Sequence, residues 1–137
     1  MTPDEARTRF AAEPVAHLAT LDAQGYPHIV PITFAIDGSR IVSAVDGKPK
    51  RGGRLHRLEN IEANPRVSLL VDHYHQDWAR LWWVRADGNA RIVEADSELT
   101  RILDLLRERY YQYQRVELTG PAIVVEVESW SGWAAAG

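Results

Sequence analysis

Apolar residues alternate with polar or small residues in the first third of the chain, which is the spacing of β-strands. Residues 15–21 (VAHLATL) alternate in this way and end at the turn sequence DAQG. The next run, residues 26–36, is rich in β-branched and aromatic residues but contains two prolines, which lack the N–H group that a central strand needs. We therefore expect an edge or bulged strand there. After the turn sequence DGS, residues 40–45 (RIVSAV) predict a third strand.

Three other segments place apolar residues at helical spacing. They are residues 3–12, 54–64 and 96–113. The apolar faces of the last two consist of Leu55, Leu58 and Ile61, and of Leu99, Ile102, Leu103, Leu106 and Tyr110. The first begins with a proline followed by acidic residues, as helices often do.

The remaining runs predict strands. Residues 67–74 have a continuous apolar centre, which indicates burial on both faces. A long strand over 79–94 has a kink or turn at ADGN, and 122–130 form a last strand. The strands follow one another with few helices between them, and no repeat or linker interrupts the chain. We therefore expect one domain over residues 1–137, mainly β with flanking helices: an antiparallel barrel of six or seven strands.

Composition narrows the functional classes. The chain has no cysteine, which excludes disulfides, thiol catalysis and thiolate metal sites. The net charge of −3 disfavours a general nucleic-acid partner, and no apolar run is long enough to span a membrane. The charged start MTPDEARTRF lacks the apolar core of a signal peptide, so a cytoplasmic location is expected. No GxGxxG, P-loop or GxSxG pattern is present.

One stretch, residues 48–57 (KPKRGGRLHR), concentrates positive charge in this acidic chain. Five of its ten residues are lysine or arginine: Lys48, Lys50, Arg51, Arg54 and Arg57. Cations and glycine-rich backbone just before a helix suit a bound phosphate group. A solvated loop and a contact with an acidic protein remain the alternatives.

Histidine and tryptophan give weaker indications. His73 and His75 share a strand face and could bind a metal, but the pattern lacks a third ligand and is also that of a solvated strand end. Isolated histidines such as His17 and His28 are more often packed or surface residues. The five tryptophans lie in DWARLWW and WSGW, where they either pack in a core or dimer contact, or stack on a flat ligand.

The succession VAHLATLDAQGYPHIVPITFAIDG, a basic segment, and NIEANPRVSLLVD resembles the pyridoxamine-phosphate-oxidase-like split β-barrel flavoproteins. The resemblance extends over roughly residues 8 to 133, and it is greatest to a branch of oxidoreductases that depend on coenzyme F-420, a deazaflavin with a phosphate. It implies a homodimer with two cofactors at the subunit interface, each ring lying against strands and each phosphate held by Arg and Lys.

Carried over residue by residue, the resemblance assigns four groups to the cofactor. The strand around Pro31, Ile32 and Thr33 supplies backbone contacts to the ring, and Ser43 and Ala44 lie where the next strand passes it. Arg57 takes the place of a phosphate-binding lysine, and the other four cations of the basic stretch complete the wall around the phosphate. Trp130 and Trp133 form an aromatic end that approaches the cofactor from one subunit.

The expected function is therefore that of an oxidoreductase in which F-420 transfers hydride to an electron-poor small molecule such as a quinone, an enone or a tetrapyrrole. The substrate-binding arginine and histidine signature of pyridoxamine phosphate oxidase is missing, which argues against that reaction. A long cationic loop favours F-420 over FMN as the cofactor. The alternatives are an FMN-dependent reductase or oxidase of the same fold, and a non-enzymatic protein that binds a cofactor or haem. No metal site is expected.

Overall fold

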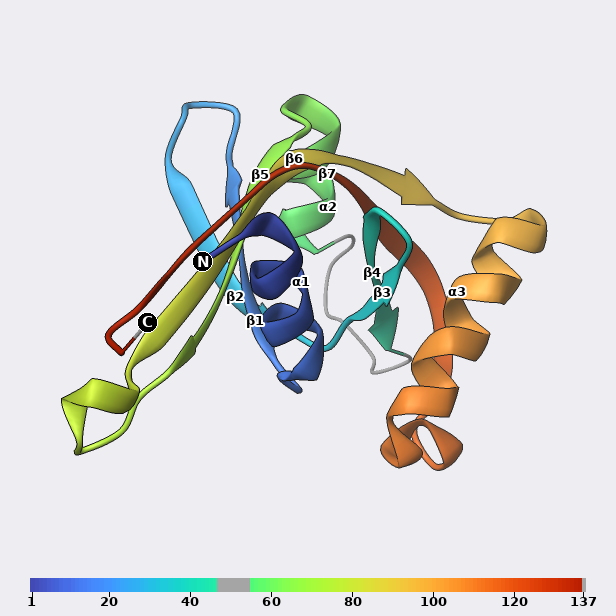
Figure 1. The fold of residues 1–137 in the computed structure, drawn as a ribbon. Helices are drawn as coiled ribbons and strands as arrows, with labels where there is room; N and C mark the ends of the chain where they lie inside the picture. The colour runs from blue at the N-terminus through green and yellow to red at the C-terminus, as the bar shows by residue number, and fades with distance from the viewer. Residues whose placement is uncertain (47–54, 137) are drawn as a thin grey trace.

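The computed structural model describes residues 1–46 and 55–136. Within them, seven strands form one antiparallel sheet in the spatial order β2-β1-β5-β6-β7-β4-β3 (Figure 1). The strands are β1 (Ala16–Leu21), β2 (Pro27–Ile32), β3 (Ala35–Asp37), β4 (Arg40–Asp46), β5 (Arg66–His73), β6 (Trp82–Val93) and β7 (Leu118–Ala134). The helices are α1 (Pro3–Ala12), α2 (His56–Ala63) and α3 (Asp96–Arg109), with short 3₁₀ turns at Trp78–Arg80 and Tyr111–Gln114. The mainly β fold expected from the sequence is confirmed.

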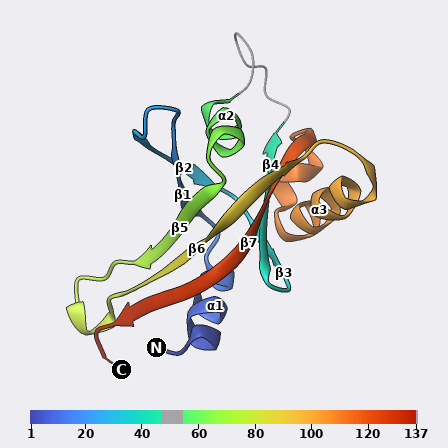
Figure 2. The same cartoon turned by 90° about the horizontal axis from the view of Figure 1, so that it is seen from above.

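The single strand predicted over residues 26–36 is wrong, because this run divides into β2 and β3, which lie at opposite edges of the sheet. Only Thr33 and Phe34 connect them. Three successive Cα–Cα steps, from Ile32 to Ala35, span at most about 11 Å. The two edges must therefore approach each other, and the sheet curls into a split barrel, as seen from above in Figure 2. The expectation that the prolines confine this segment to an edge is confirmed, since β2 pairs with β1 alone within residues 1–46 and 55–136.

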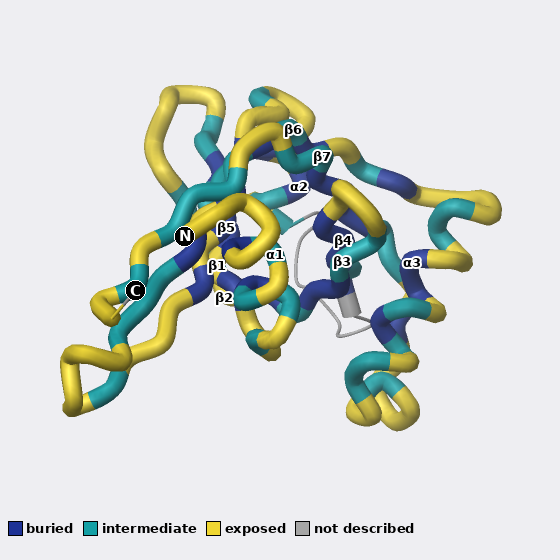
Figure 3. Tube along the Cα trace, viewed as in Figure 1, coloured by how far each residue is buried: buried dark blue, intermediate teal, exposed yellow. Residues whose placement is uncertain are grey.

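Apolar side chains pack in two clusters, because alternate residues of β4 point to opposite sides of the sheet. Ile41 and Val45 face the barrel interior, whereas Val42 faces α3. The interior cluster is closed by Ala6 and Phe10 of α1 and by Leu58 and Ile61 of α2. The outer cluster is covered by Ile102, Leu103 and Leu106 of α3, whose buried positions lie on the side toward β3 and β4 (Figure 3). Most of the predicted apolar faces are thus buried, while Leu55, Leu99 and Tyr110 of these faces are partly buried.

β5 differs from the prediction, because it is buried on one face only. Val67, Leu69 and Val71 point into the barrel, but Leu70 between them is 39% exposed. Both α1 and α2 pack on the interior side, so they leave the other side of this strand uncovered. None of the described helices combines the length and the apolar character that a bilayer-crossing helix needs.

The kink predicted at ADGN is confirmed as a β-bulge between β6 and β7. Asp87 pairs with Ser129 and Gly88 pairs with Val127, so Glu128 is an extra residue on β7. A Cβ atom at position 88 would collide with the backbone carbonyl of Glu126, which explains why glycine occupies it. The bulge bends β6 and β7 together, and it lets both strands serve the two halves of the barrel.

Candidate functional site

The crossover between β2 and β3 brings together several of the residues that the sequence assigns to a cofactor. Ile32 is buried in the barrel core, and Thr33 follows it at the crossover. The hydroxyl of Ser43 donates a hydrogen bond to the carbonyl oxygen of Thr33 at 2.7 Å. The Thr33 hydroxyl lies 2.6 Å from the hydroxyl of Tyr113. Ala44, by contrast, packs with the α3 cluster on the other side of β4.

Two residues at the end of α3 fix this crossover. The guanidinium of Arg109 donates to the carbonyl oxygens of Phe34 at 2.6 Å, of Ala11 at 2.9 Å, and of Glu13. The hydroxyl of Tyr110 accepts from the Phe34 N–H at 3.1 Å and lies 2.9 Å from the Phe34 carbonyl oxygen. Burial raises the pKa of the Tyr110 phenol, which keeps it protonated. The backbone around Thr33 is therefore held from both sides.

Nitrogen donors gather where β2 meets the start of α2. The ring of His28 on β2 lies 5.8 Å from the ring of His56, and Arg57 is the next residue of the helix. The Nδ1 atom of His28 is buried and has no hydrogen-bond partner among the described residues. α2 is fixed on β1 by the amide of Asn60, which donates to the Thr20 hydroxyl at 3.0 Å. We call His28, His56 and Arg57 the anion corner.

The residue types of the anion corner are those of phosphate-binding sites. It combines the His28 imidazole of β2 with His56 and Arg57, which are the first two residues of a helix of eight residues, where backbone N–H groups are also left without partners inside the helix. The buried, unpaired Nδ1 of His28 is a donor or acceptor without a partner, and a phosphate oxygen would provide one. The predicted residues Lys48, Lys50, Arg51 and Arg54 lie outside the described residues. The sequence places them between β4 and this corner.

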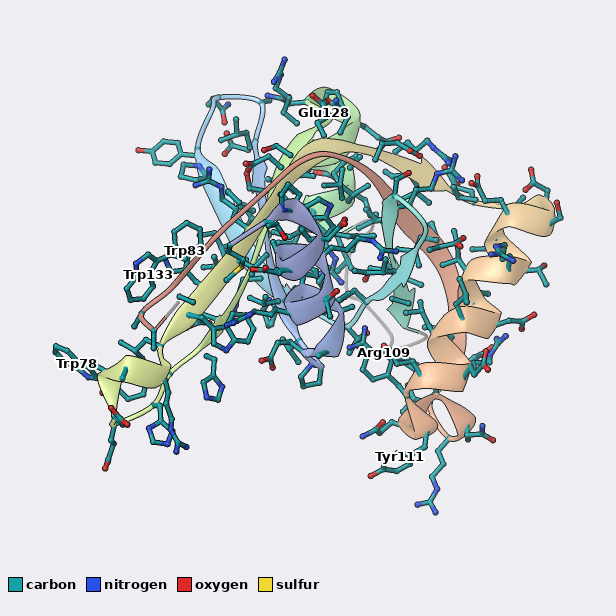
Figure 4. The ribbon with its side chains drawn as sticks, viewed as in Figure 1. Trp78, Trp83, Arg109, Tyr111, Glu128 and Trp133 are labelled. Atoms are coloured by element: carbon teal, nitrogen blue, oxygen red, sulfur yellow. The ribbon has the colours of Figure 1, made fainter. Side chains whose placement is uncertain are left out.

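The two C-terminal tryptophans predicted to act together lie on opposite faces of β7. Trp130 faces the interior and packs edge-on against Phe10 of α1, with ring centroids 5.3 Å apart. Trp133 is 47% exposed and pairs across the strands with Trp83, as Figure 4 shows. Ser43 pairs with Ile123, so about 30 Å of strand separate it from Trp133 along β7. A single chain does not bring Trp133 to the crossover.

The outer face of β2, β1, β5 and β6 carries two neighbouring hollows. The first, of about 650 Å³, is lined by His17, Ala19, Ile29, Ser68, Leu69, Leu70, Asp72, Trp83 and Arg85. The second, of about 450 Å³, lies toward the bulge and shares Ala19 and Ser68 with the first. Pro31 faces the same side, directly opposite His17 in the β1–β2 pairing. The predicted ring-contact strand therefore borders this face.

The model of the pyridoxamine 5'-phosphate oxidase family matches residues 2–134 of the chain. The chain belongs to this family. A curated relative, the 5a,11a-dehydrotetracycline/5a,11a-dehydrooxytetracycline reductase of Streptomyces rimosus, is 37% identical over 65 residues. That match covers 47% of this chain and 44% of the reductase, so the chain spans less than half the length of the relative.

Solved structures of low sequence identity share the fold. Rv2991 from Mycobacterium tuberculosis matches with a TM-score of 0.76 at 22% identity, over 98% of this chain and 86% of that protein. HutZ, the haem storage protein of Vibrio cholerae, matches with a TM-score of 0.67 at 22% identity, over 98% and 95%. These likenesses confirm that this member of the pyridoxamine 5'-phosphate oxidase family is a split barrel.

One residue of the candidate site is not indicated by its local sequence. His28 had been interpreted as an ordinary packed or surface histidine, yet it lies in the anion corner. Its inward position follows from its pairing with the buried Thr20, which the alternation of β1 and β2 could have indicated. Its contact with His56 is long-range and has no local signal.

The metal alternative gains no support from the described part of the chain, where no three His, Asp or Glu side chains gather as a metal site would require. His73 instead stacks on Trp82, with ring centroids 6.0 Å apart, and on His75 at 6.4 Å. His75 accepts a hydrogen bond from the Asp77 N–H at 2.9 Å. These two histidines belong to an aromatic stack beside α1, whose Arg9 guanidinium lies over the Trp82 ring, 5.5 Å from its centroid.

Proposed function

We propose that the protein is an oxidoreductase that uses the deazaflavin coenzyme F-420 to reduce an electron-poor small molecule of the quinone, enone or tetrapyrrole type. The anion corner carries this proposal, because the unpaired Nδ1 atom of His28 fits a cofactor phosphate, and Arg57 follows His56 directly at the start of α2. The five cations of residues 48–57 exceed what one FMN phosphate needs, which favours the more anionic deazaflavin. When bound, the deazaflavin supplies the hydride.

The protein's own residues would bind and orient this cofactor. His28 and Arg57 would hold the phosphate, and Thr33 lies five residues along the chain from His28, about 17 Å of extended backbone. Among the described strands β2 pairs with β1 alone, so its other edge has backbone groups that can contact a ring. Ser43 fixes the Thr33 carbonyl, which keeps the end of this edge in one position.

The curated relative supports the choice of substrate class. The name of that reductase describes the reduction of a dehydrotetracycline, which is the saturation of a carbon–carbon double bond in a polycyclic compound. A conjugated double bond is electron-poor and accepts hydride at carbon. We therefore place enones first among the candidate substrates of this chain.

A homodimer is part of the proposal. Trp133 is a large apolar residue that stands exposed on the outer face without lining the larger hollow, and a second copy would cover it. A partner could also bring its aromatic end to a crossover that the same chain's Trp133 does not reach. Sedimentation analysis should give twice the mass of one chain, and a monomer at micromolar concentration would refute this part.

Parallel titrations of the purified protein with F-420 and with FMN test the proposed function. We expect tighter binding of F-420, and we expect the double variant Lys50→Glu/Arg57→Glu to abolish it while the melting temperature stays unchanged. His28→Ala should weaken binding of either cofactor about tenfold, since a hydrogen bond to a charged group contributes about 1.5–3 kcal/mol. His75→Ala, outside the corner, is the matched control and should bind normally.

Each other outcome points to one alternative. Tighter binding of FMN, or yellow protein that keeps its colour through desalting, would identify a flavin enzyme. A Soret band on addition of haem, without affinity for F-420 or FMN, would identify a haem-binding protein. Unchanged cofactor affinity in both the double variant and His28→Ala would refute the assignment of the phosphate to the anion corner.

A further inference from the structure

The larger hollow on the outer face results from the sizes of the side chains that the strand register places together. Ala19 on β1 and Ser68 on β5 pair with each other at its floor. Bulkier residues surround them: Ile29 pairs with Ala19 on one side, while Leu70 and Trp83 stand further along β5 and β6. Small side chains flanked by large apolar ones leave a depression, and its volume of about 650 Å³ lies within the range of small-molecule sites.

The charges at the rim of the hollow do not balance. Arg85 donates to a carboxylate oxygen of Asp87 at 3.1 Å, and the Ser68 hydroxyl donates to the other oxygen of Asp87 at 2.6 Å. These three side chains satisfy one another. Asp72 also lines the hollow, but within the described part of the chain no hydrogen bond or ion pair reaches its carboxylate. The hollow therefore has one uncompensated negative charge.

Asp72 stands directly beside an aromatic surface, since it pairs with Trp83 across β5 and β6. A carboxylate next to an indole face is a combination that attracts organic cations, because both the charge and the ring quadrupole favour them. The rest of the wall, Ile29 and Leu70, is apolar and suits a flat ring system. We propose that this hollow binds a flat polycyclic ligand that carries an amine, with the ammonium group against Asp72 and Trp83.

The position of the hollow gives this ligand a role. His17 lines it, and Pro31, which the sequence assigns to the cofactor ring, pairs with His17. Ile29 of β2 also lines the hollow, so a ligand there contacts the same strand whose edge is proposed to hold the ring. The identification of this ligand as the substrate rests on the proposed function. The binding of the ligand in the hollow does not depend on it.

Titrations with proflavine, a flat fluorescent cation, and with acridine, a related ring system that is uncharged near neutral pH, test the proposal. They use the full-length protein without added cofactor. We expect proflavine to bind more tightly than acridine. Asp72→Asn should weaken proflavine about fivefold, as expected for one exposed charge pair, and leave acridine unchanged. Trp83→Leu should weaken both ligands, since it removes the stacking surface and the cation–π contact.

Asp104→Asn, the same chemical change on the exposed surface of α3, is the matched control and should have no effect. Asp72→Lys tests the sign of the charge and should abolish the preference for proflavine. Equal binding of the two probes, or an unchanged proflavine affinity in Asp72→Asn, would overturn the proposal. F-420 affinity, measured separately, should be the same in Asp72→Asn and wild type. A wild-type protein that does not bind F-420 would therefore contradict the proposed function without contradicting the proposed ligand site in the hollow.

Discussion

Arg109 connects three parts of the chain through a single guanidinium, and its removal should have a large effect on stability. It donates to the Phe34 carbonyl in the β2–β3 crossover, and to the Ala11 and Glu13 carbonyls at the end of α1. It also lies over the ring of Phe34, 4.6 Å from the centroid, and over that of Tyr110 at 5.1 Å. The perturbation we consider is Arg109→Met, which keeps much of the length and removes every donor.

The magnitude follows from what each partner loses. The Phe34 carbonyl keeps the Tyr110 hydroxyl as a neighbour at 2.9 Å, and water can reach the partly buried carbonyls of α1. The cost per bond is therefore near the typical net value of about 1 kcal/mol rather than that of a fully buried charge pair. The three hydrogen bonds together give a loss of about 3 kcal/mol in the free energy of unfolding. Arg109→Lys, which cannot reach three carbonyls with one ammonium, should lose about half of this.

Urea unfolding followed by tryptophan fluorescence measures the effect, because the midpoint shifts while the slope stays constant when only stability changes. A loss of about 3 kcal/mol corresponds to a fall of about 10 °C in melting temperature for a chain of this size. Arg115→Met, a change of the same type just beyond α3, should stay within about 0.5 kcal/mol of wild type. A loss below about 1 kcal/mol for Arg109→Met, or an equal loss for Arg115→Met, would refute this account of the crossover.

Two further predictions concern the bulge and an ion pair. Gly88→Ala should lower the free energy of unfolding by at least about 2 kcal/mol, because the new Cβ meets the Glu126 carbonyl. Gly38→Ala should cost only about 1 kcal/mol, because its Cβ meets nothing within 4 Å and the cost comes from the φ of +63°. Thermal melts in which Gly38→Ala is the less stable of the two variants would contradict this. The hydrogen bonds from Arg101 to Asp37, at 2.9 and 3.0 Å, hold the pKa of that carboxyl below its ordinary value. The stabilisation by this ion pair is present above the unfolded pKa of about 4 and is lost as pH falls through the lower folded pKa. Asp37→Asn should therefore lose less stability than the wild type on acidification. Acid denaturation curves of the two proteins that run parallel would contradict this.

The sequence predicted those parts of the fold that depend on the alternation of apolar and polar residues within a single strand. Strands 15–21 and 40–45 have one buried and one exposed or differently packed face, so their alternation is visible. The run 26–36 concealed its division, because no glycine, asparagine or aspartate separates Ile32 from Ala35. Closure of the barrel, which is a property of the whole sheet, decides that the chain changes edge there. The exposure of Leu70 is likewise decided by where the helices pack.

The candidate site was predictable in part for a similar reason. The charge of the basic stretch and the place of Arg57 before a helix are local features. The contact between His28 and His56 joins residues 28 positions apart in the sequence, and no pattern within either segment indicates it. The separation of Trp130 from Trp133 could have been derived, since an odd spacing on a strand puts side chains on opposite faces. The strand was predicted to end at residue 130, whereas β7 continues to Ala134.

β2 is the element on which the proposals converge, and its place at an edge is what makes them compatible. A central strand has its backbone groups paired on both sides, so only an edge strand can offer them to a ligand. An exposed edge also invites pairing with another chain, and Pro27 and Pro31 oppose this because they lack N–H donors. His28 between them faces α2, whereas Ile29 faces the outer hollow. One short strand at the edge of the described sheet thus places an anion corner and the wall of an apolar hollow within a few residues of each other.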